Sequence, residues 1–258
     1  MSGRLEGKAG LVTGAAAGLG RAVLLAIAAE GGCVVGLDRD REALEQTIAE
    51  AGGGPGQAVA VVGDVAVEAD VVAAITACVD RFGTFNLLDN NAGVAVEARL
   101  HETSLQQWDR VCDVNLRGAF FGCKHGVIAM RAHGGGAIVN TGSIASLGGD
   151  PLLPAYSTTK AGLLGLTRSI AVDYAADGIR ANAICPGDML TPMLERSFAA
   201  APDPAAFRAT MEGAYPLKRI ADPAEVAAAV VFLLSDEASF ITGTSLVVDG
   251  GLTINLYS

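Results

Sequence analysis

Aromatic and basic side chains are scarce in this sequence of 258 residues. Phe, Trp and Tyr make up 5% of it, with a single Trp. Lys and Arg number 18 against 28 Asp and Glu, which gives a formal net charge of −10. Because proteins bind nucleic-acid phosphates through clustered Lys and Arg, this balance argues against a nucleic-acid partner.

The sequence also lacks a long apolar run, a cysteine motif and a cluster of metal-binding side chains. Its longest apolar stretch, around 226–234, has about ten residues, whereas a membrane-spanning helix needs about twenty. The opening residues, MSGRLEGKAGLVTG, contain no apolar segment of signal-peptide length. Five cysteines without a C-x-x-C pair favour free thiols in a reducing compartment, and His101, His125 and His133 show no ligand spacing. We therefore expect a cytoplasmic protein with no membrane span and no metal site.

Short apolar runs alternate with longer helical patterns along the chain. The short runs are rich in Val, Ile and Leu, which is typical of strands buried on both faces of a parallel sheet. With 51% hydrophobic residues and 33 glycines, the chain suits a large, tightly packed α/β core. The pattern predicts a single-domain, doubly wound parallel sheet of about seven strands with helices on both faces. Expected strands cover 9–13, 33–37, 58–62, 86–90, 136–140, 179–185 and 245–249, and expected helices cover 18–30, 40–51, 67–82, 104–132, 154–177 and 222–235.

Residues 187–216 interrupt this alternation. The segment contains Pro192, Pro202, Pro204 and Pro216, which break regular structure, yet it carries many apolar side chains. A loop of this length inside a compact domain is usually functional, so we expect a substrate lid at about 187–216. The alternative is a pair of short helices packed permanently on the core.

A glycine-rich turn follows the first expected strand. In TGAAAGLG, Gly14, Gly18 and Gly20 stand where the strand gives way to a helix. Glycine lets the backbone turn tightly and approach a ligand, and the helix start offers free N–H groups to a pyrophosphate. The spacing differs from G-x-G-x-x-G, so a structural turn in a glycine-rich chain is the alternative. Ala17 gives this turn no basic side chain.

Acidic residues end the second and third expected strands. Asp38 stands where a carboxylate accepts hydrogen bonds from the adenosine ribose, and its charge repels a 2′-phosphate. This favours NAD over NADP, although Arg39 and Arg41 are close enough in sequence to reach a phosphate. Asp64 ends the third strand, and it either faces the adenine or caps the following helix.

The stretch AYSTTKAG places Tyr156 and Lys160 four residues apart, on one face of an expected helix. A free tyrosine has a pKa of about 10, so it is a poor general base near neutral pH. A nearby ammonium stabilises the phenolate, and each unit by which the pKa falls corresponds to about 1.36 kcal/mol. The pair predicts a proton-transfer site in which the lysine lowers the pKa of the tyrosine.

Together these motifs resemble those of the short-chain dehydrogenase/reductase family, and the resemblance covers nearly the whole chain. Each motif alone is weak, but they occur in the family's order and at the strand or helix ends that each requires. They are TGxxxGxG at 13–20, NNAG at 90–93, an asparagine at Asn115 in VNLRG, a serine at Ser143 in VNTGSIAS, YxxxK at 156–160, a PG turn with a threonine at 186–191, and VDGG at 248–251.

The resemblance implies a Rossmann-type fold, an NAD(P) cofactor and the interconversion of a secondary alcohol and a ketone. It implies that Tyr156 is the general acid/base and that Lys160 also holds the nicotinamide ribose. It assigns the substrate oxygen to Ser143 and a water linked to Lys160 to Asn115. The expected cofactor positions are Gly14, Ala17, Gly18, Leu19, Gly20, Asp38, Asp64, Val65, Asn91, Ala92, Gly93, Tyr156, Lys160, Pro186, Gly187, Met189 and Thr191; the expected substrate positions are Ser143, Ala145, Leu153, Tyr156, Gly187 and Met193.

The expected substrate is a small molecule, and the expected assembly is a homotetramer, because members of the family commonly form tetramers. Most pocket positions are apolar, which suits a cyclic or aliphatic alcohol better than a sugar phosphate, with Asp150 and Asp188 as polar contacts. The closest alternative function is an NADPH-dependent 3-ketoacyl-thioester reductase, against which Asp38 argues. A nucleotide-sensing regulator without catalysis is a third reading, and the complete catalytic set argues against it.

Asp89 departs from the family pattern. It precedes NNAG on a buried strand, where the family usually has an apolar residue. A buried carboxylate needs a partner or a raised pKa. The sequence does not name that partner, so the local packing around Asp89 stays open.

Overall fold

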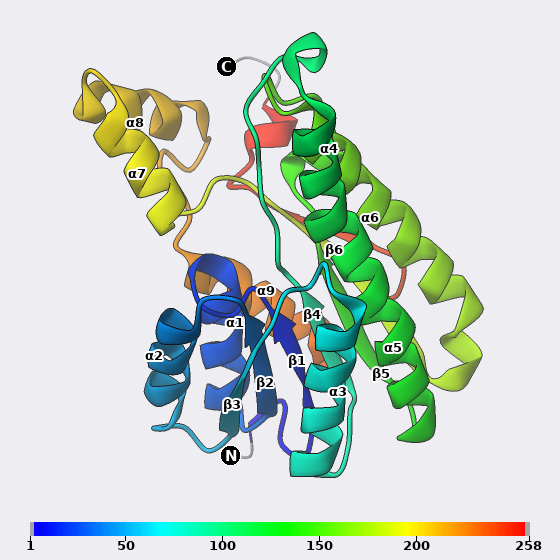
Figure 1. The fold of residues 1–258 in the computed structure, drawn as a ribbon. Helices are drawn as coiled ribbons and strands as arrows, with labels where there is room; N and C mark the ends of the chain where they lie inside the picture. The colour runs from blue at the N-terminus through cyan, green and yellow to red at the C-terminus, as the bar shows by residue number, and fades with distance from the viewer. Residues whose placement is uncertain (1–2, 256–258) are drawn as a thin grey trace.

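The computed structural model describes residues 3–255, apart from the side chain of Met193. The strands are β1 (Ala9–Thr13), β2 (Cys33–Asp38), β3 (Gln57–Val62), β4 (Leu87–Asn90), β5 (Gly136–Thr141), β6 (Ile179–Pro186) and β7 (Ser245–Val248). Within residues 3–255 they form one seven-stranded sheet in the order β3-β2-β1-β4-β5-β6-β7. All neighbouring strands run parallel, and Figure 1 shows them between two layers of helices. The predicted doubly wound, Rossmann-type sheet is confirmed.

The helices divide between the two faces of the sheet. On one face, α1 (Gly18–Ala29), α2 (Arg41–Ala51) and α9 (Pro223–Leu234) share an apolar core with Val12 and Val139. On the other face, α3 (Glu68–Phe82), α5 (Gly118–Ala132) and α6 (Pro154–Asp173) pack on Leu11, Leu88 and Ile138. No helix in the described part of the chain is long and apolar enough to cross a membrane.

The long helix expected over 104–132 is two helices. α4 (Leu105–Cys112) is followed by one π-helical turn, Asp113–Arg117, which continues directly into α5. The expectation of one regular helix is therefore wrong at the position of Asn115. Single π-turns inside helices are frequent at functional sites, because they redirect side chains without ending the helix.

The segment expected as an irregular lid is largely helical. α7 (Pro192–Ala200) and α8 (Pro204–Ala214) each begin with a proline at the first helical position, where the missing N–H costs no hydrogen bond. The rings of Phe198 and Phe207 pack edge to face, with centroids 5.7 Å apart. Phe198, Tyr215 and Ile220 form an apolar cluster separate from the two main cores. The pair forms a lobe beyond the end of the sheet (Figure 1), so the helical alternative describes its structure.

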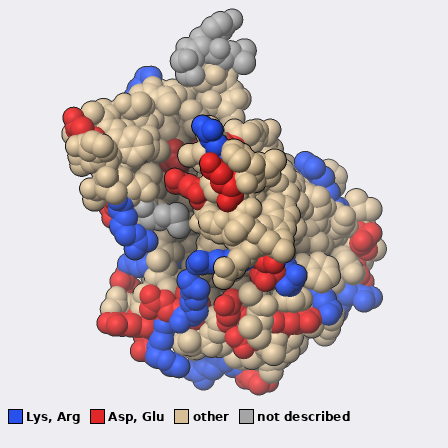
Figure 2. Space-filling view, turned by 45° about the horizontal axis from the view of Figure 1, so that its top comes forward, with Lys and Arg blue, Asp and Glu red and all other residues tan. Residues whose placement is uncertain are grey.

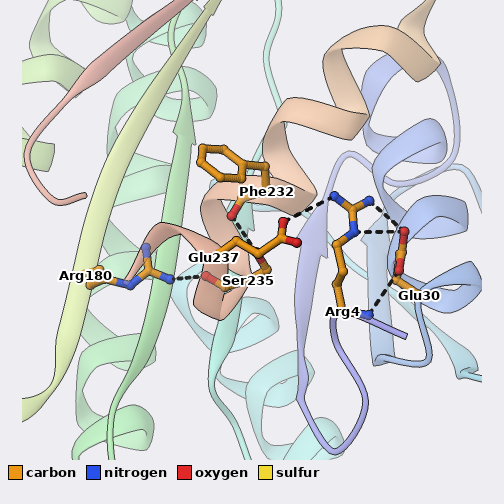
Figure 3. A network of polar contacts seen from close by, with 6 residues as sticks. All are labelled: Arg4, Glu30, Arg180, Phe232, Ser235 and Glu237. Carbon is orange, nitrogen blue, oxygen red and sulfur yellow. Dashed lines mark hydrogen bonds and ion pairs between the residues drawn. The ribbon is translucent and has the colours of Figure 1, made fainter. Parts of the chain in front are cut away.

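The amino end of the sheet is closed by paired polar groups (Figure 3). The guanidinium of Arg180, on β6, donates to the carbonyls of Leu233 at 2.8 Å and Ser235 at 2.9 Å, at the C-terminus of α9. Arg4 binds Glu30 through its backbone N–H and its side chain. The Arg180 contacts satisfy carbonyls at the end of α9, where a helix leaves them without an intrahelical partner, and Arg4 pairs with the carboxylate of Glu30.

Candidate active site

The residues singled out by the sequence meet at the opposite edge, where the strands end. β1, β4, β5 and β6 run parallel, so the turns after their last residues lie beside one another. The chain brings to this edge the glycine turn, the NNAG stretch, Ser143 and the Pro186 turn. In open α/β sheets, this edge is where ligands bind.

The glycine turn is shaped by contacts that leave no room for side chains. Gly14 and Gly18 have φ values of +67° and +55°, a region that favours glycine. A methyl group on Gly14 would lie 2.9 Å from Ala92 Cα, and one on Gly20 would clash with the Gly14 carbonyl. The turn therefore packs directly on the NNAG stretch.

The start of α1 suits an anionic ligand. Ala17 occupies the N-cap and offers no side-chain hydrogen bond, and the first turn contains no acidic residue. The N–H groups of a helix start and the positive end of its dipole bind phosphate oxygens. A helix start of this kind, with Gly18 and Leu19 in its first turn, could hold the pyrophosphate of a dinucleotide.

Thr13 ties the glycine turn to NNAG, a role that sequence reasoning missed. Its hydroxyl oxygen accepts hydrogen bonds from the backbone N–H groups of Asn91 at 3.0 Å and Ala92 at 3.1 Å. The Asn91 side chain in turn donates to the Thr13 carbonyl at 3.0 Å. The only signal in the sequence was a threonine at the head of the glycine motif.

Asp38 ends β2 beside the glycine turn. Its carboxylate accepts hydrogen bonds from the backbone N–H groups of Ala16 and Asp40, each at 3.0 Å. A carboxylate has about four lone-pair sites, so ribose hydroxyls can still bind it. Arg41 is exposed and pairs with Glu45 at 3.5 Å, along α2.

Asp64 makes hydrogen bonds within the loop before α3 and to its first turn. Its carboxylate accepts a hydrogen bond from Ala66 N at 2.9 Å, and its own N–H donates to Asp70 at 2.8 Å. Asp64 therefore does not cap α3, because the N-cap is Val67, and its contact with the adenine stays a prediction. Val65 is buried against Gly118 of α5.

Lys160 and Asn115 converge on Gly93. A methyl group on Gly93 would lie 3.4 Å from Lys160 Nζ and 3.5 Å from Asn115 Oδ1. Lys160 is buried, and its Nζ donates to the Thr141 carbonyl at 2.5 Å. The π-turn aims Asn115 at Val94, whose N–H and C=O it binds at 2.7 and 2.9 Å.

Tyr156 and Ser143 face each other across the site. Burial raises the pKa of Tyr156, the nearby Ser143 hydroxyl lowers it, and the charges of Asp150 and Asp188 raise it further. The Ser143 hydroxyl oxygen also accepts a hydrogen bond from Ala145 N at 3.1 Å.

The expected lowering of the tyrosine pKa is absent from this structure. Lys160 Nζ lies 5.5 Å from the centre of the Tyr156 ring and is turned toward Thr141. The pKa of Tyr156 is raised rather than lowered, and burial is the largest cause. Burial also lowers the pKa of Lys160 to about 8, while Asp89 and Cys185 oppose this change. Lys160 can lower the pKa of Tyr156 only if its ammonium turns toward the phenol.

The Pro186 turn closes the site against the glycine turn. A methyl group on Gly18 would lie 3.3 Å from Thr191 Cγ2. Thr191 also caps α7, and Met189 pairs with Ala221 in an isolated bridge. Gly187 fits against Tyr215, whose hydroxyl donates to the Asp188 carboxylate at 2.7 Å.

The expected substrate positions differ in their burial. Ala145 is buried and Leu153 is half-buried at the start of α6, whereas the side chain of Met193 lies outside the described residues. Burial and the charges of Asp188 and Glu97 raise the pKa of Asp150. Figure 2 shows acidic side chains gathered beside the hollow below the α7–α8 lobe. Across residues 3–255 there is no group of His, Cys, Asp or Glu arranged to hold a metal ion.

Known proteins are similar to this chain over nearly its whole length. Residues 14–253 match the family described as enoyl-(acyl carrier protein) reductase. The chain is 40% identical to a cyclohexanol dehydrogenase of Acinetobacter sp. over 98% of both chains. It is 38% identical to a 3-oxoacyl-[acyl-carrier-protein] reductase of Thermotoga maritima, covering 97% of this chain and all of that one.

A solved structure of levodione reductase superposes with a TM-score of 0.93 at 36% identity, covering 98% of this chain and all of that one. Identity at this level over nearly full length, with the same parallel sheet, decides family membership. The chain belongs to the short-chain dehydrogenase/reductase family of oxidoreductases.

Proposed function

We propose that the protein is an NAD-dependent oxidoreductase that interconverts a secondary alcohol and a ketone by hydride transfer. The observation that carries the proposal is the convergence of Lys160, Asn115 and the Tyr156–Ser143 pair beside a turn shaped for a pyrophosphate. The nicotinamide ring supplies or accepts the hydride when it is bound. The side chains of this protein hold the substrate oxygen and move its proton.

Tyr156 takes the proton of the alcohol during oxidation and returns it to the carbonyl oxygen during reduction. The Ser143 hydroxyl, which is close enough to lower the pKa of Tyr156, orients the same oxygen. Lys160 holds the nicotinamide ribose and lowers the pKa of Tyr156 once its ammonium turns from Thr141 to the phenol. Asn115, anchored on Val94, holds a water next to Lys160.

The preference for NAD rests on Asp38. Its carboxylate lies at the end of β2, held by Ala16 and Asp40, where a 2′-phosphate would meet a negative charge. Arg41 is already paired with Glu45 on the exposed side of α2, and Ala17 adds no positive charge to the turn. This arrangement favours free ribose hydroxyls over a phosphorylated ribose.

A cyclic or aliphatic secondary alcohol is the substrate class that the apolar positions support. The names of two similar proteins, cyclohexanol dehydrogenase and levodione reductase, point to substrates of this kind. The second candidate is an NADPH-dependent 3-ketoacyl-thioester reductase, favoured by the Thermotoga maritima relative and by the description of the matched family. Asp38 supports the first candidate against the second.

A substrate screen separates the two candidates. The purified protein is assayed with NAD and NADP on cyclic and linear secondary alcohols, and with NADH and NADPH on a 3-ketoacyl thioester. We expect the highest kcat/KM for a secondary alcohol with NAD. A higher kcat/KM for the thioester with NADPH would replace this proposal with the second candidate.

We also propose that the protein works as a cytoplasmic homotetramer. Phe120, 48% exposed on α5, lines an apolar surface groove with Cys112, Leu116 and Leu166 from the neighbouring turns and α6. Burying such a patch between subunits removes apolar area from water. All five cysteines are free thiols, which supports a reducing compartment. Light scattering of the purified protein measures the mass of the assembly.

A further inference from the structure

Asp89 is a fully buried carboxyl group in the middle of the sheet. It has no exposed surface and lies on β4 between Val12 of β1 and Val139 of β5. Side chains alternate along a strand, so Asp89 faces the apolar core beneath α1 and α9, to which Val12 and Val139 belong. Neither carboxyl oxygen has a hydrogen-bond partner among the described residues. A group of this kind is costly to bury, and so its retention needs a reason.

Thr141 connects Asp89 to the catalytic lysine. It lies on β5 two residues after Val139, on the same face as Asp89, and its buried hydroxyl also has no partner at full hydrogen-bond geometry within residues 3–255. The Thr141 hydroxyl is nonetheless close enough to lower the pKa of Asp89. On the other side, the Thr141 carbonyl accepts the 2.5 Å hydrogen bond from Lys160 Nζ. Thr141 thus contacts the Lys160 ammonium through its carbonyl and faces the Asp89 carboxyl with its side chain.

The charges around this pair are few. Burial raises the pKa of Asp89 to about 7, and the Lys160 ammonium opposes this change. Burial lowers the pKa of Lys160 to about 8, and Asp89 and the Cys185 thiol of β6 oppose it. Burial also raises the pKa of Cys185, and Asp89 has the larger electrostatic effect on Lys160 of the two. The helices over this face contribute apolar side chains to the core, namely Leu19, Val23, Val226 and Val230.

We propose that Asp89 is a positioning residue whose carboxylate, acting across Thr141, keeps the buried Lys160 ammonium protonated. The proposal rests on the proposed function, in which that ammonium holds the nicotinamide ribose and stabilises the Tyr156 phenolate. A neutral amine carries no charge to stabilise the phenolate, and burial alone drives Lys160 toward the neutral form. Asp89 offsets that effect from below the sheet edge, where it blocks neither cofactor nor substrate.

The test measures the protonation of Lys160 directly, without turnover. The sequence contains four lysines, Lys8, Lys124, Lys160 and Lys218, so labelling lysine with ¹³C at Cε gives four signals. The Lys160→Arg variant assigns the signal of interest. In the ligand-free protein, we expect Asp89→Asn to lower the pKa of Lys160 by about one unit or more, because the nearby carboxylate is gone. An unchanged pKa in Asp89→Asn would overturn the proposal.

Two further variants keep the test decisive. Thr141→Val retains the carbonyl that binds Lys160 but removes the hydroxyl facing Asp89, so it should lower the pKa of Lys160 in the same direction and by less. Asp80→Asn, on the exposed face of α3, should leave it unchanged. Should Asp89→Asn fail to fold, an unchanged pKa in Thr141→Val would still overturn the proposal.

An activity measurement separates this proposal from the proposed function. The pH dependence of kcat/KM is measured for the wild type and for Asp89→Asn, with NAD and the best alcohol substrate. The pH above which kcat/KM falls should be lower in Asp89→Asn than in the wild type. The same substitution acting only on folding would change the melting temperature and leave this pH unchanged, which would count against the proposal. A shifted lysine signal in a protein that oxidises no alcohol would support the Asp89–Lys160 pair and refute the proposed function.

Discussion

The two ends of the sheet treat buried polar groups in opposite ways. At the amino end, Arg180 donates to the carbonyls that close α9, and the Arg4–Glu30 pair joins the start of the chain to the turn after α1. At the carboxyl end, buried oxygens are left without hydrogen-bond partners. Among residues 3–255, the side chains with such oxygens are Asp89, Asn90, Thr141 and Ser157.

The paired polar groups at the amino end stabilise the fold, whereas the unpaired ones at the carboxyl end lie where the proposed chemistry takes place. An unsatisfied buried polar group costs about 1–3 kcal/mol, so a fold selected for stability alone would pair or remove these groups. Their concentration around Lys160 and Tyr156 marks the carboxyl end as the place where polar chemistry is needed. Substitutions at the two ends should therefore affect different measurements.

The largest expected effect comes from Tyr156→Phe at the carboxyl end. Removing the hydroxyl removes the proton-transfer group, so kcat should fall by about 10²–10⁴-fold while NAD binding is retained. The matched control is Tyr174→Phe, the same change just after the other end of α6, which should leave kcat unchanged. A Tyr156→Phe enzyme with more than about a tenth of the wild-type kcat would break the comparison.

The next effect concerns the cofactor. Asp38→Ala should reduce the ratio of kcat/KM with NAD to kcat/KM with NADP by about 10–100-fold, because it removes a charged hydrogen-bond acceptor worth about 1.5–3 kcal/mol. Steady-state kinetics with both cofactors measure this ratio. A wild-type preference for NADP would show that Arg39 or Arg41 binds the phosphate and that the assignment of Asp38 is wrong.

At the amino end, Arg180→Met should reduce stability and spare the chemistry. The lost donor removes the side-chain hydrogen bonds to the Leu233 and Ser235 carbonyls at the end of α9, which should lower the free energy of unfolding by about 1–3 kcal/mol. Calorimetry measures the change, with Arg131→Met as control, because Arg131 is exposed and pairs with Asp177 at the surface. An equal loss of unfolding free energy in Arg180→Met and Arg131→Met would show that the hydrogen bonds of Arg180 have no particular role in stability.

The smallest effect is expected in the α7–α8 lobe. We propose that this lobe is a lid, because its apolar cluster around Phe198 is separate from the main cores and it lies above the site. Its amides should exchange hydrogen quickly in the free protein and slowly with NAD and substrate bound. Strong protection without ligands would show a fixed element instead of a lid.

The sequence predicted the parts of the site that depend on local patterns. The glycine turn, Asp38 at a strand end and the Tyr156–Lys160 spacing each follow from rules of strands and helices, and the strand order places them at one edge. The prolines at 192 and 204 were misinterpreted as breaks, because the same residue also starts helices.

What the sequence did not predict depends on contacts between distant segments. The π-turn at Asn115 has the same apolar pattern as a regular helix, so no periodicity reveals it. The proximity of Asp89 to Thr141 follows from the register of β4 and β5, which is decided by the whole sheet. The direction of the Tyr156 pKa shift depends on how deeply the fold buries the ring, and helical spacing does not encode this.

The most direct test of the proposed chemistry follows one hydrogen atom. A secondary alcohol deuterated at its carbinol carbon is incubated with NAD and the wild-type protein or Tyr156→Phe. The account predicts that wild-type protein transfers the deuterium to the nicotinamide ring, as mass spectrometry of the reduced cofactor would show, and that Tyr156→Phe loses nearly all of this transfer. Reduced cofactor without deuterium, or equal transfer by Tyr156→Phe, would contradict it.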